Sequence, residues 1–327
     1  MVPARPLTKL VLMKSAAIVA MSLMLAACNR SHGPSAAERA AQARAEAAFK
    51  SAQQAWRAQR VAELTKPDGW TSLIGLHLLD DGVHRVGSGA DNGIRLLMGP
   101  SRLGLFTLRD GKVSFSADAE VSLDGQPSRG GALRSDHDAG GPDIVSFDEG
   151  KGLLAVIERG DRLWLRVKHA DADSRLRFTG LTYWPGGRDW QVQARFIAHP
   201  KGTTLEIGNI IGSTDKIANP GAVEFTRDGK VYRIEALDEG EGTLFLVFAD
   251  RTSGHGSYGA GRFLDAPKPD AKGRVMIDFN RAYNPPCAFT LFATCPLPPM
   301  QNRLDLRIEA GEKAYVKPAP LPGTVRP

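Results

Sequence analysis

The hydrophobic pattern changes twice along the chain. An uncharged apolar stretch occupies residues 15–27, and residues 36–65 form a segment rich in Ala, Gln, Arg and Glu. This second segment contains no Gly or Pro, and Ser35 and Glu38 at its start have the spacing of a capping box. The pattern therefore predicts one long N-terminal α-helix over residues 36–65.

From Trp70 onward, apolar and polar residues alternate with the period of two that is typical of half-buried β-strands. Asp-Gly pairs at 110–111, 124–125 and 228–229 separate such runs, and this pair is a strong signal for a tight hairpin turn. Roughly a dozen or more short strands follow, without helical periodicity between them. We therefore expect a mainly β protein, with an antiparallel body of the sandwich or barrel type behind the helix, rather than a Rossmann or TIM-barrel fold.

Two glycines and a proline interrupt the alternation at residues 136–142. We therefore expect a small β-sandwich-like subdomain at 70–135, a main β domain at 142–316 and a Pro-rich tail at 317–327. Residues 82–133 weakly resemble forkhead-associated domains in their Gly-Ser and Asn-Gly punctuation. The phosphopeptide-reading side chains of that family are not recognisable here, so the resemblance implies a topology and no binding activity.

The beginning of the chain has the organisation of a secretory signal peptide. Basic residues precede the apolar stretch, which is too short to span a hydrocarbon core of about 30 Å. Leu25-Ala-Ala-Cys28 resembles the bacterial lipobox, and this resemblance implies cleavage before Cys28 and lipid attachment to its thiol. An ordinary signal peptide that ends near a cysteine is the alternative.

We therefore expect a signal peptide at residues 1–27 and a lipidated tether at 28–35. Several acyl chains on Cys28 would hold the protein stably on a membrane, which would be its first partner. The expected location is the cell envelope, with the protein facing the periplasm. Asn29 after the cysteine favours the outer membrane, as the resemblance to bacterial lipoproteins implies.

The charge balance argues against nucleic-acid binding. The chain carries 42 Lys and Arg against 36 Asp and Glu, a formal net charge of +6. Arg5, Lys9 and Lys14 lie in the expected signal peptide, which leaves 39 − 36 = +3 for the mature protein. The remaining basic residues alternate with acidic ones and form no run of the nucleic-acid-binding type. The sequence contains no P-loop, no H-E-x-x-H motif and no histidine pair at i, i+4, so neither a cofactor nor a metal is predicted.

Several long phrases resemble one bacterial family of uncharacterised proteins, domain of unknown function 1684. The phrases are DGW at 68–70, IERG at 157–160, DFNRAYNPPCAF at 278–289, ATCPLPP at 293–299, NRL at 302–304 and AGEK at 310–313. The resemblance extends over about residues 56–313. Because the function of the family is unknown, it implies no activity.

Two cysteines in the last third lie close together. Cys287 and Cys295 enclose seven residues in a Pro-rich loop. In an oxidising periplasm we expect a disulfide, which would stabilise the fold by roughly 2–3 kcal/mol. The alternatives are two reduced buried thiols, a reactive thiol, or a metal pair that would need two further ligands.

Polar side chains follow two apolar runs of the last third. One run, at 244–248, precedes Asp250, and the other, at 275–279, contains Asp278. If the two runs are neighbours in one sheet, these side chains meet at one edge. In one interpretation they satisfy loop backbone groups. In the other they form a pocket for a small anionic or sugar-like ligand, with the candidate ligand-binding residues Thr252, Tyr258, Arg262, Asn280, Tyr283, Asn284 and Asn302.

Two functions remain compatible with the sequence. The first is a lipid-anchored protein that binds a small molecule or an envelope component, or supports the envelope. The alternative is a periplasmic hydrolase-type enzyme, in which Asp250 or Asp278 acts as general base and Arg262 stabilises developing negative charge. A carboxylate with a raised pKa beside an open cavity would favour the enzyme. A dry, fully hydrogen-bonded cluster would favour a structural role.

Overall fold

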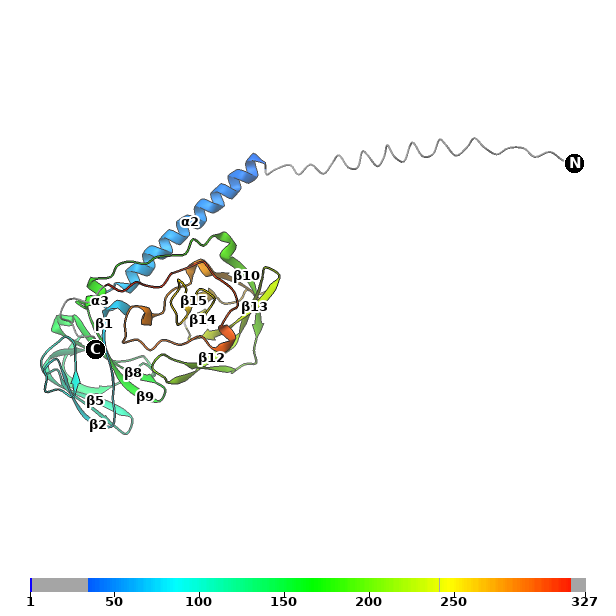
Figure 1. The fold of residues 1–327 in the computed structure, drawn as a ribbon. Coiled ribbons are helices and arrows are strands. Elements are labelled where there is room, and N and C mark those ends of the chain that lie inside the picture. The colour runs from blue at the N-terminus through cyan, green and yellow to red at the C-terminus, as the bar shows by residue number, and fades with distance from the viewer. Residues whose placement is uncertain (2–34, 241, 319–327) are drawn as a thin grey trace. The chain divides into compact units, whose positions relative to one another are not determined.

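The computed structural model describes Met1, residues 35–240 and residues 242–318, and it divides the chain into two compact units, 1–51 and 52–327. The expected signal peptide, the tether with Cys28 and most of the expected Pro-rich tail lie outside the described residues. Helix α2 spans Ala36–Leu64, close to the predicted range (Figure 1).

The predicted capping box is present at the start of α2. The backbone N–H of Ser35 donates to Glu38 Oε2 over 2.6 Å, and the N–H of Glu38 donates to Ser35 Oγ over 3.2 Å. These two bonds satisfy N–H groups that have no partner inside the helix. None of the helices within the described residues combines the length and the hydrophobicity that a bilayer crossing requires.

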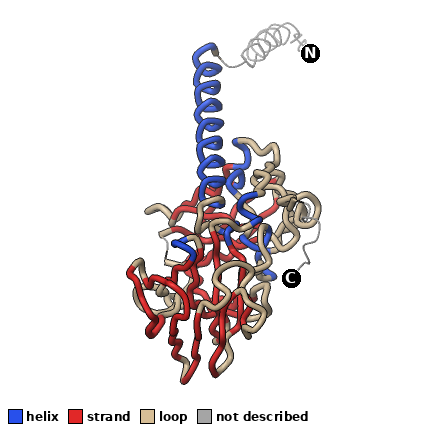
Figure 2. Tube along the Cα trace, turned by 90° about the vertical axis from the view of Figure 1, so that its left-hand side faces the viewer, coloured by secondary structure: helices blue, strands red, loops and turns tan. Residues whose placement is uncertain are grey.

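Strands account for most of the regular structure of the second unit, as predicted (Figure 2). The first sheet has the order β1-β9-β8-β7-β5-β4-β2-β3, and β6 pairs with β5. All its pairs are antiparallel except β2 with β3. Its strands are β1 (Leu73–Leu78), β2 (Gly82–Gly87), β3 (Ile94–Arg95), β4 (Gly104–Arg109), β5 (Lys112–Leu123), β6 (Gln126–Leu133), β7 (Ile144–Phe147), β8 (Gly152–Arg159) and β9 (Arg162–His169).

The second sheet is antiparallel, with the order β15-β14-β13-β12-β10-β16 and with β11 paired to β12. The two end strands, β15 and β16, also contact each other, which makes the sheet barrel-like. In Figure 1, β10 and β12 to β15 lie together, beside the group of β2, β5, β8 and β9. The strands are β10 (Gln191–Ala198), β11 (Thr204–Gly208), β12 (Thr214–Arg227), β13 (Lys230–Asp238), β14 (Thr243–Phe248), β15 (Arg262–Pro267) and β16 (Arg274–Asp278).

Short helical turns connect these elements. They are η1 (Trp70–Ser72), η2 (Asp148–Gly150), α3 (Asp173–Leu176), η3 (Arg188–Trp190), η4 (Phe279–Arg281), η5 (Pro286–Ala288) and η6 (Met300–Asn302). The last three follow β16, in a segment from Phe279 to the end of the described residues that contains no assigned strand.

Each sheet has its own hydrophobic core. In the first, the rings of Phe106 and Phe115 lie 4.5 Å apart between neighbouring strands. In the second, Phe279 lies at the centre of an aromatic cluster, with its ring 5.5 Å from that of Phe225 and 5.8 Å from that of Phe248. Aromatic pairs at such separations add stabilisation to that of the buried area.

The predicted Asp-Gly turns are confirmed, because 110–111, 124–125 and 228–229 connect consecutive antiparallel strands with positive φ at both residues.

The domain boundary differs from the expectation. Residues 136–142 lie between β6 and β7 of the same sheet, and the chain leaves that sheet only after β9. The Gly-Pro segment is a turn whose ends are joined by the ion pair of Arg134 and Asp143, so its composition marks a long turn rather than a boundary.

Gly130 and Gly131, adjacent in β6, provide a test of the fold. A Cβ on Gly130, which has a φ of +119°, would overlap the carbonyl oxygen of Phe115, whereas a Cβ on Gly131 meets nothing within 4 Å. We expect Gly130→Ala to lower the free energy of unfolding by about 3 kcal/mol, and Gly131→Ala to change it by less than about 0.5 kcal/mol. Urea unfolding of both variants measures the difference. Equal effects would contradict the described pairing of β5 and β6.

Candidate functional site

Arg262 and Asp250, two of the predicted catalytic residues, form a buried pair. Both side chains are fully buried, and Nη2 of Arg262 lies 3.3 Å from Oδ1 of Asp250. Arg262 also donates to the carbonyls of Ile308 and Ala310, and Asp250 accepts the N–H of Ile308 over 2.8 Å. Burial lowers the pKa of Arg262, and the charge of Asp250 opposes this shift. The pair therefore holds the irregular C-terminal segment against the sheet.

The polar side chains next to this pair also form hydrogen bonds within the protein. The hydroxyl of Thr252 donates to Asp250 and shares a 2.7 Å hydrogen bond with the hydroxyl of Ser257. Ser257 in turn accepts from the indole N–H of Trp184 over 2.9 Å. Tyr258 is half-buried, and burial raises its pKa.

Asp278 belongs to a different network. It accepts from the side-chain amides of Gln53 over 2.9 Å and Gln191 over 3.1 Å, and from Asn280, whose own amide also bonds to the backbone of Gly187. No described side chain hydrogen-bonds to both Asp250 and Asp278. Asp250 and Asp278 therefore have separate hydrogen-bond partners.

Asn284 and Asn302 bind backbone groups. The side-chain amide of Asn284 donates to the carbonyl of Lys313. Asn302 donates to the carbonyls of Glu235 and Val247 and accepts the N–H of Glu235, and so it joins β13 to β14. These buried bonds, together with those of Asp250 and Arg262, favour the structural interpretation over the catalytic one.

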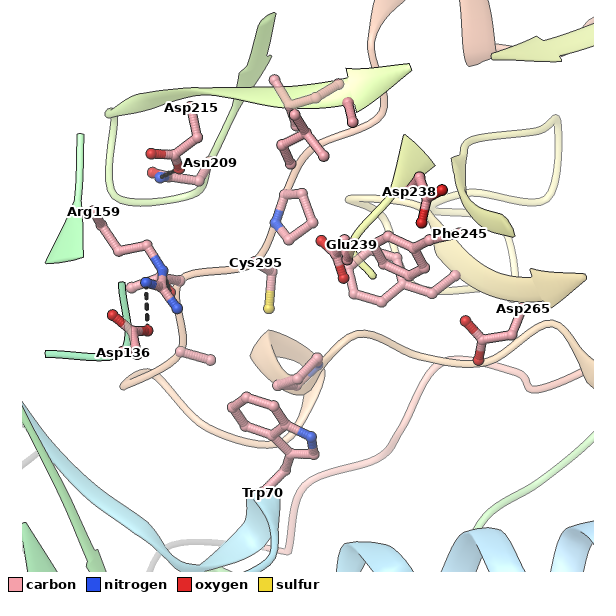
Figure 3. Close-up of a pocket in the computed structure, with 18 of the residues that line it drawn as sticks. Trp70, Asp136, Arg159, Asn209, Asp215, Asp238, Glu239, Phe245, Asp265 and Cys295 are labelled. Atoms are coloured by element: carbon pink, nitrogen blue, oxygen red, sulfur yellow. Dashed lines mark hydrogen bonds and ion pairs between the residues drawn. The ribbon is translucent and has the colours of Figure 1, made fainter. Parts of the chain in front are cut away.

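A cavity of about 850 Å³ lies elsewhere in the second unit, between the two sheets (Figure 3). One side carries Trp70 from η1, Asp136 and His137 from the β6–β7 turn, Arg159 from the end of β8 and Arg166 from β9. The other side is lined by β11 to β15 and by the loop that contains Cys295. Its polar and apolar residues include Ile207, Asn209, Asp215, Asp238, Glu239, Phe245, Phe263, Asp265, Tyr283, Pro286, Ala293 and Thr294.

Two guanidinium groups converge on one oxygen in this cavity. Nε of Arg159 and Nη2 of Arg166 each lie 3.2 Å from Oγ1 of Thr294 and donate to it. Arg159 also pairs with Asp136, with Nη1 2.7 Å from Oδ2 (Figure 3). Arg166 forms no ion pair with a carboxylate of the described residues, and its buried Nε has no hydrogen-bond partner there.

The electrostatic environment of Arg166 is unfavourable for its charge. Burial, followed by repulsion from Arg159, lowers the pKa of Arg166 to about 10, while Asp136 acts in the opposite direction. At neutral pH the group is still protonated. Its guanidinium carbon lies 5.6 Å from the ring centroid of Trp70, and Lys168 Nζ lies 5.8 Å from the same ring. A cation–π contact of this kind compensates only part of a desolvated charge.

The predicted disulfide between Cys287 and Cys295 is confirmed, and its Cys295 lines the cavity. The carbonyl of Cys295 accepts the N–H of Ile210 over 3.1 Å, and the N–H of Leu297 donates to Gly208 over 2.8 Å. The disulfide and these two backbone hydrogen bonds therefore hold the chain in place on the C-terminal side of Thr294. They thereby also position Oγ1 of Thr294, which the two arginines contact.

The other end of the cavity is aromatic. The rings of Phe245 and Phe263 lie 4.9 Å apart edge to face, and the ring of Tyr283 lies 5.9 Å from that of Phe263. The hydroxyl of Tyr283 donates to Asp265 Oδ2 over 3.0 Å, and burial strongly raises the pKa of Tyr283. This end can hold an apolar group.

Of the predicted residues, Tyr283 and Cys295 line the cavity, whereas the other proposed ligand-binding and catalytic residues do not. The sequence analysis did not identify Trp70, Arg159, Arg166 or Thr294 as site residues. Three of these four lie in the phrases DGW, IERG and ATCPLPP, so the phrases were the signal that could have located the site. Arg166 has no such signal, because it occupies an ordinary position in an alternating strand.

The buried pair of Arg262 and Asp250 leads to a test of the structural interpretation. Arg262→Ala leaves a buried carboxylate without its cation, so we expect the free energy of unfolding to fall by about 3–5 kcal/mol. Arg251→Ala, which breaks the exposed pair with Asp305, is the control and should change it by less than about 1 kcal/mol. Urea unfolding measures both. An Arg262 variant as stable as the control would contradict the structural role.

Comparison with known proteins places part of this chain in a family. Residues 176–313 match the family model "Protein of unknown function (DUF1684)". An uncharacterized protein of Haloarcula marismortui, solved by NMR, is 32% identical over 42% of this chain and 78% of its own, with a TM-score of 0.36. A search of curated proteins finds no match. Through residues 176–313, the chain therefore belongs to DUF1684, a family of proteins of unknown function.

Proposed function

We propose that the protein is a small-molecule binding protein that holds an anionic ligand in the cavity between its two sheets. The observation that carries this proposal is the position of Arg166. It is a largely buried cation that lines an open cavity, has no carboxylate partner among the described residues and points an N–H group at the oxygen that Arg159 also contacts.

The physical argument concerns the cost of an uncompensated charge. Removal of a guanidinium from water is unfavourable unless an anion and further hydrogen bonds compensate it. In the protein alone, Arg159 pairs with Asp136, whereas Arg166 donates to the neutral hydroxyl of Thr294, which supplies no negative charge. An oxyanion at this place would supply the missing charge and accept the free N–H groups, as arginines bind carboxylates and phosphates elsewhere.

The alternative of a hydrolase that uses Asp250 or Asp278 has less support. Both carboxylates are occupied by internal hydrogen bonds, and neither lines the cavity. A general base must reach a proton of the substrate, so these positions are unsuitable for that role.

Arg166→Gln tests the proposed function. The probes are octanoate and octyl phosphate, and their affinities are measured by isothermal titration calorimetry together with the thermal midpoint. We expect at least one probe to bind the wild type and to raise its midpoint, and we expect the variant to lose about tenfold or more in affinity. The midpoint of the free variant should be unchanged or higher, because an unpaired buried charge is removed.

Arg162→Gln is the matched control, because Arg162 lies on the same strand but is exposed and pairs with Asp80. It removes the same charge and should leave the affinity within about twofold of that of the wild type. Failure of both probes to bind the wild type, or an unaltered affinity in Arg166→Gln, would refute the proposal.

We also propose that the mature protein is anchored to the cell envelope by lipid on Cys28. The lipobox-like residues before Cys28 and the short apolar stretch ahead of them support this proposal. The polar residues that follow Cys28 would then act as a tether between the membrane and the folded body.

Cys28→Ser provides the test in a bacterial host that processes lipoproteins. The variant lacks the thiol that carries the lipid, so we expect it to move from the membrane fraction to the soluble periplasm or to remain as uncut precursor. Fractionation followed by intact mass measurement distinguishes these forms. A wild-type protein that is already soluble and begins at another residue would contradict the anchoring.

A further inference from the structure

The charges beside Arg166 indicate how many negative charges the ligand carries. Arg159 and Arg166 contribute two positive charges, and Asp136 neutralises one of them through its ion pair with Arg159. Asp136 is held in place, because its Oδ1 also accepts the N–H of Glu158 over 2.8 Å. The net charge of Arg159, Arg166 and Asp136 together is therefore +1.

The opposite side of the cavity would repel a second negative charge. Asp238, Glu239 and Asp265 lie across the cavity from Arg159 (Figure 3). Asp238 is paired with Lys268, and the carboxylates of Glu239 and Asp265 add negative charge to this side, which favours a pose in which the single anionic group faces the arginines. The aromatic side chain of Phe245 lies on this same side, and the ring of Phe263 packs against it with the centroids 4.9 Å apart.

The hydroxyl of Thr294 requires that the ligand carry a hydrogen-bond acceptor. A hydroxyl has two acceptor lone pairs and one proton. Both acceptor positions of Thr294 are used by the two arginines, so its proton remains to be donated. A deprotonated oxygen can accept this proton and an N–H of Arg166 together and also supplies a negative charge, whereas an ammonium group has no lone pair and a protonated acid has no charge.

We propose that the ligand is a monoanion with an apolar body, such as a carboxylate or a phosphodiester, and that its oxyanion binds Arg166 and Thr294 while its apolar body contacts Phe245 and Phe263. This inference rests on the proposed function and deepens it. It assigns to Asp136 the role of the residue that sets the accepted charge at one.

The test compares ligands of similar apolar carbon content and different charge at pH 8, by isothermal titration calorimetry. Octanoate carries one charge, and dibutyl phosphate is a diester that also carries one. Octyl phosphate is largely a dianion at this pH, because the second pKa of a phosphate monoester is about 6. We expect octanoate and dibutyl phosphate each to bind the wild type about tenfold more tightly than octyl phosphate.

Asp136→Asn changes the selectivity in a defined direction. The substitution keeps the size of the side chain and an acceptor for the N–H of Glu158, but it raises the local charge to two. We expect the affinity for octyl phosphate relative to octanoate to rise about tenfold. Asp80→Asn removes the same charge at the exposed pair with Arg162 and should leave the ratio unchanged.

The outcomes separate this inference from the proposed function. If octyl phosphate binds the wild type as tightly as octanoate, or if the diester binds as weakly as octyl phosphate, the monoanion inference is overturned while an anion site remains. If no probe binds, the proposed function itself fails. If Asp136→Asn does not fold, the three affinities of the wild type still test the monoanion inference. If Asp136→Asn folds and its affinity for octyl phosphate relative to octanoate is unchanged, the inference is also overturned.

Discussion

The structure depends on how the buried backbone of the segment after β16 is hydrogen-bonded. Residues beyond Phe279 form no assigned strand within the described part of the chain, so their backbone groups make isolated bridges rather than a continuous ladder. Side chains supply further partners. Arg262 and Asp250 bind the backbone at 308–310, and Glu312, which is fully buried, accepts the N–H of Asn284 and pairs with Arg60 of α2.

The need to hydrogen-bond this buried backbone explains why the last third of the sequence is rich in polar residues that we interpreted as candidate functional residues. A fully buried arginine with a carboxylate is typical of both a catalytic centre and a structural network, and sequence alone does not separate the two. The structure separates them by access to solvent and by charge pairing: Arg262 is fully buried and pairs with Asp250. The cavity, in contrast, contains Arg166, which forms no ion pair with a carboxylate of the described residues.

The sequence was sufficient for the local structure and insufficient for the long-range arrangement. The capping box at Ser35, the Asp-Gly turns and the short Cys287–Cys295 link are encoded within a few residues, and all three were predicted. Which strands belong to the first sheet, and which residues line the cavity, depends on contacts between distant segments. Arg159 and Thr294 are separated by 135 positions, and no periodicity or composition signal reports that they meet.

The cavity is assembled from both sheets, and this has a consequence for its evolution. The family domain at 176–313 supplies Thr294, the disulfide and the aromatic wall, whereas Trp70, Asp136, Arg159 and Arg166 come from residues that precede it. The family domain is thus one half of a composite site. Because the charged residues lie outside this domain, substitutions among them would change the charge of the cavity without changing the wall that they face.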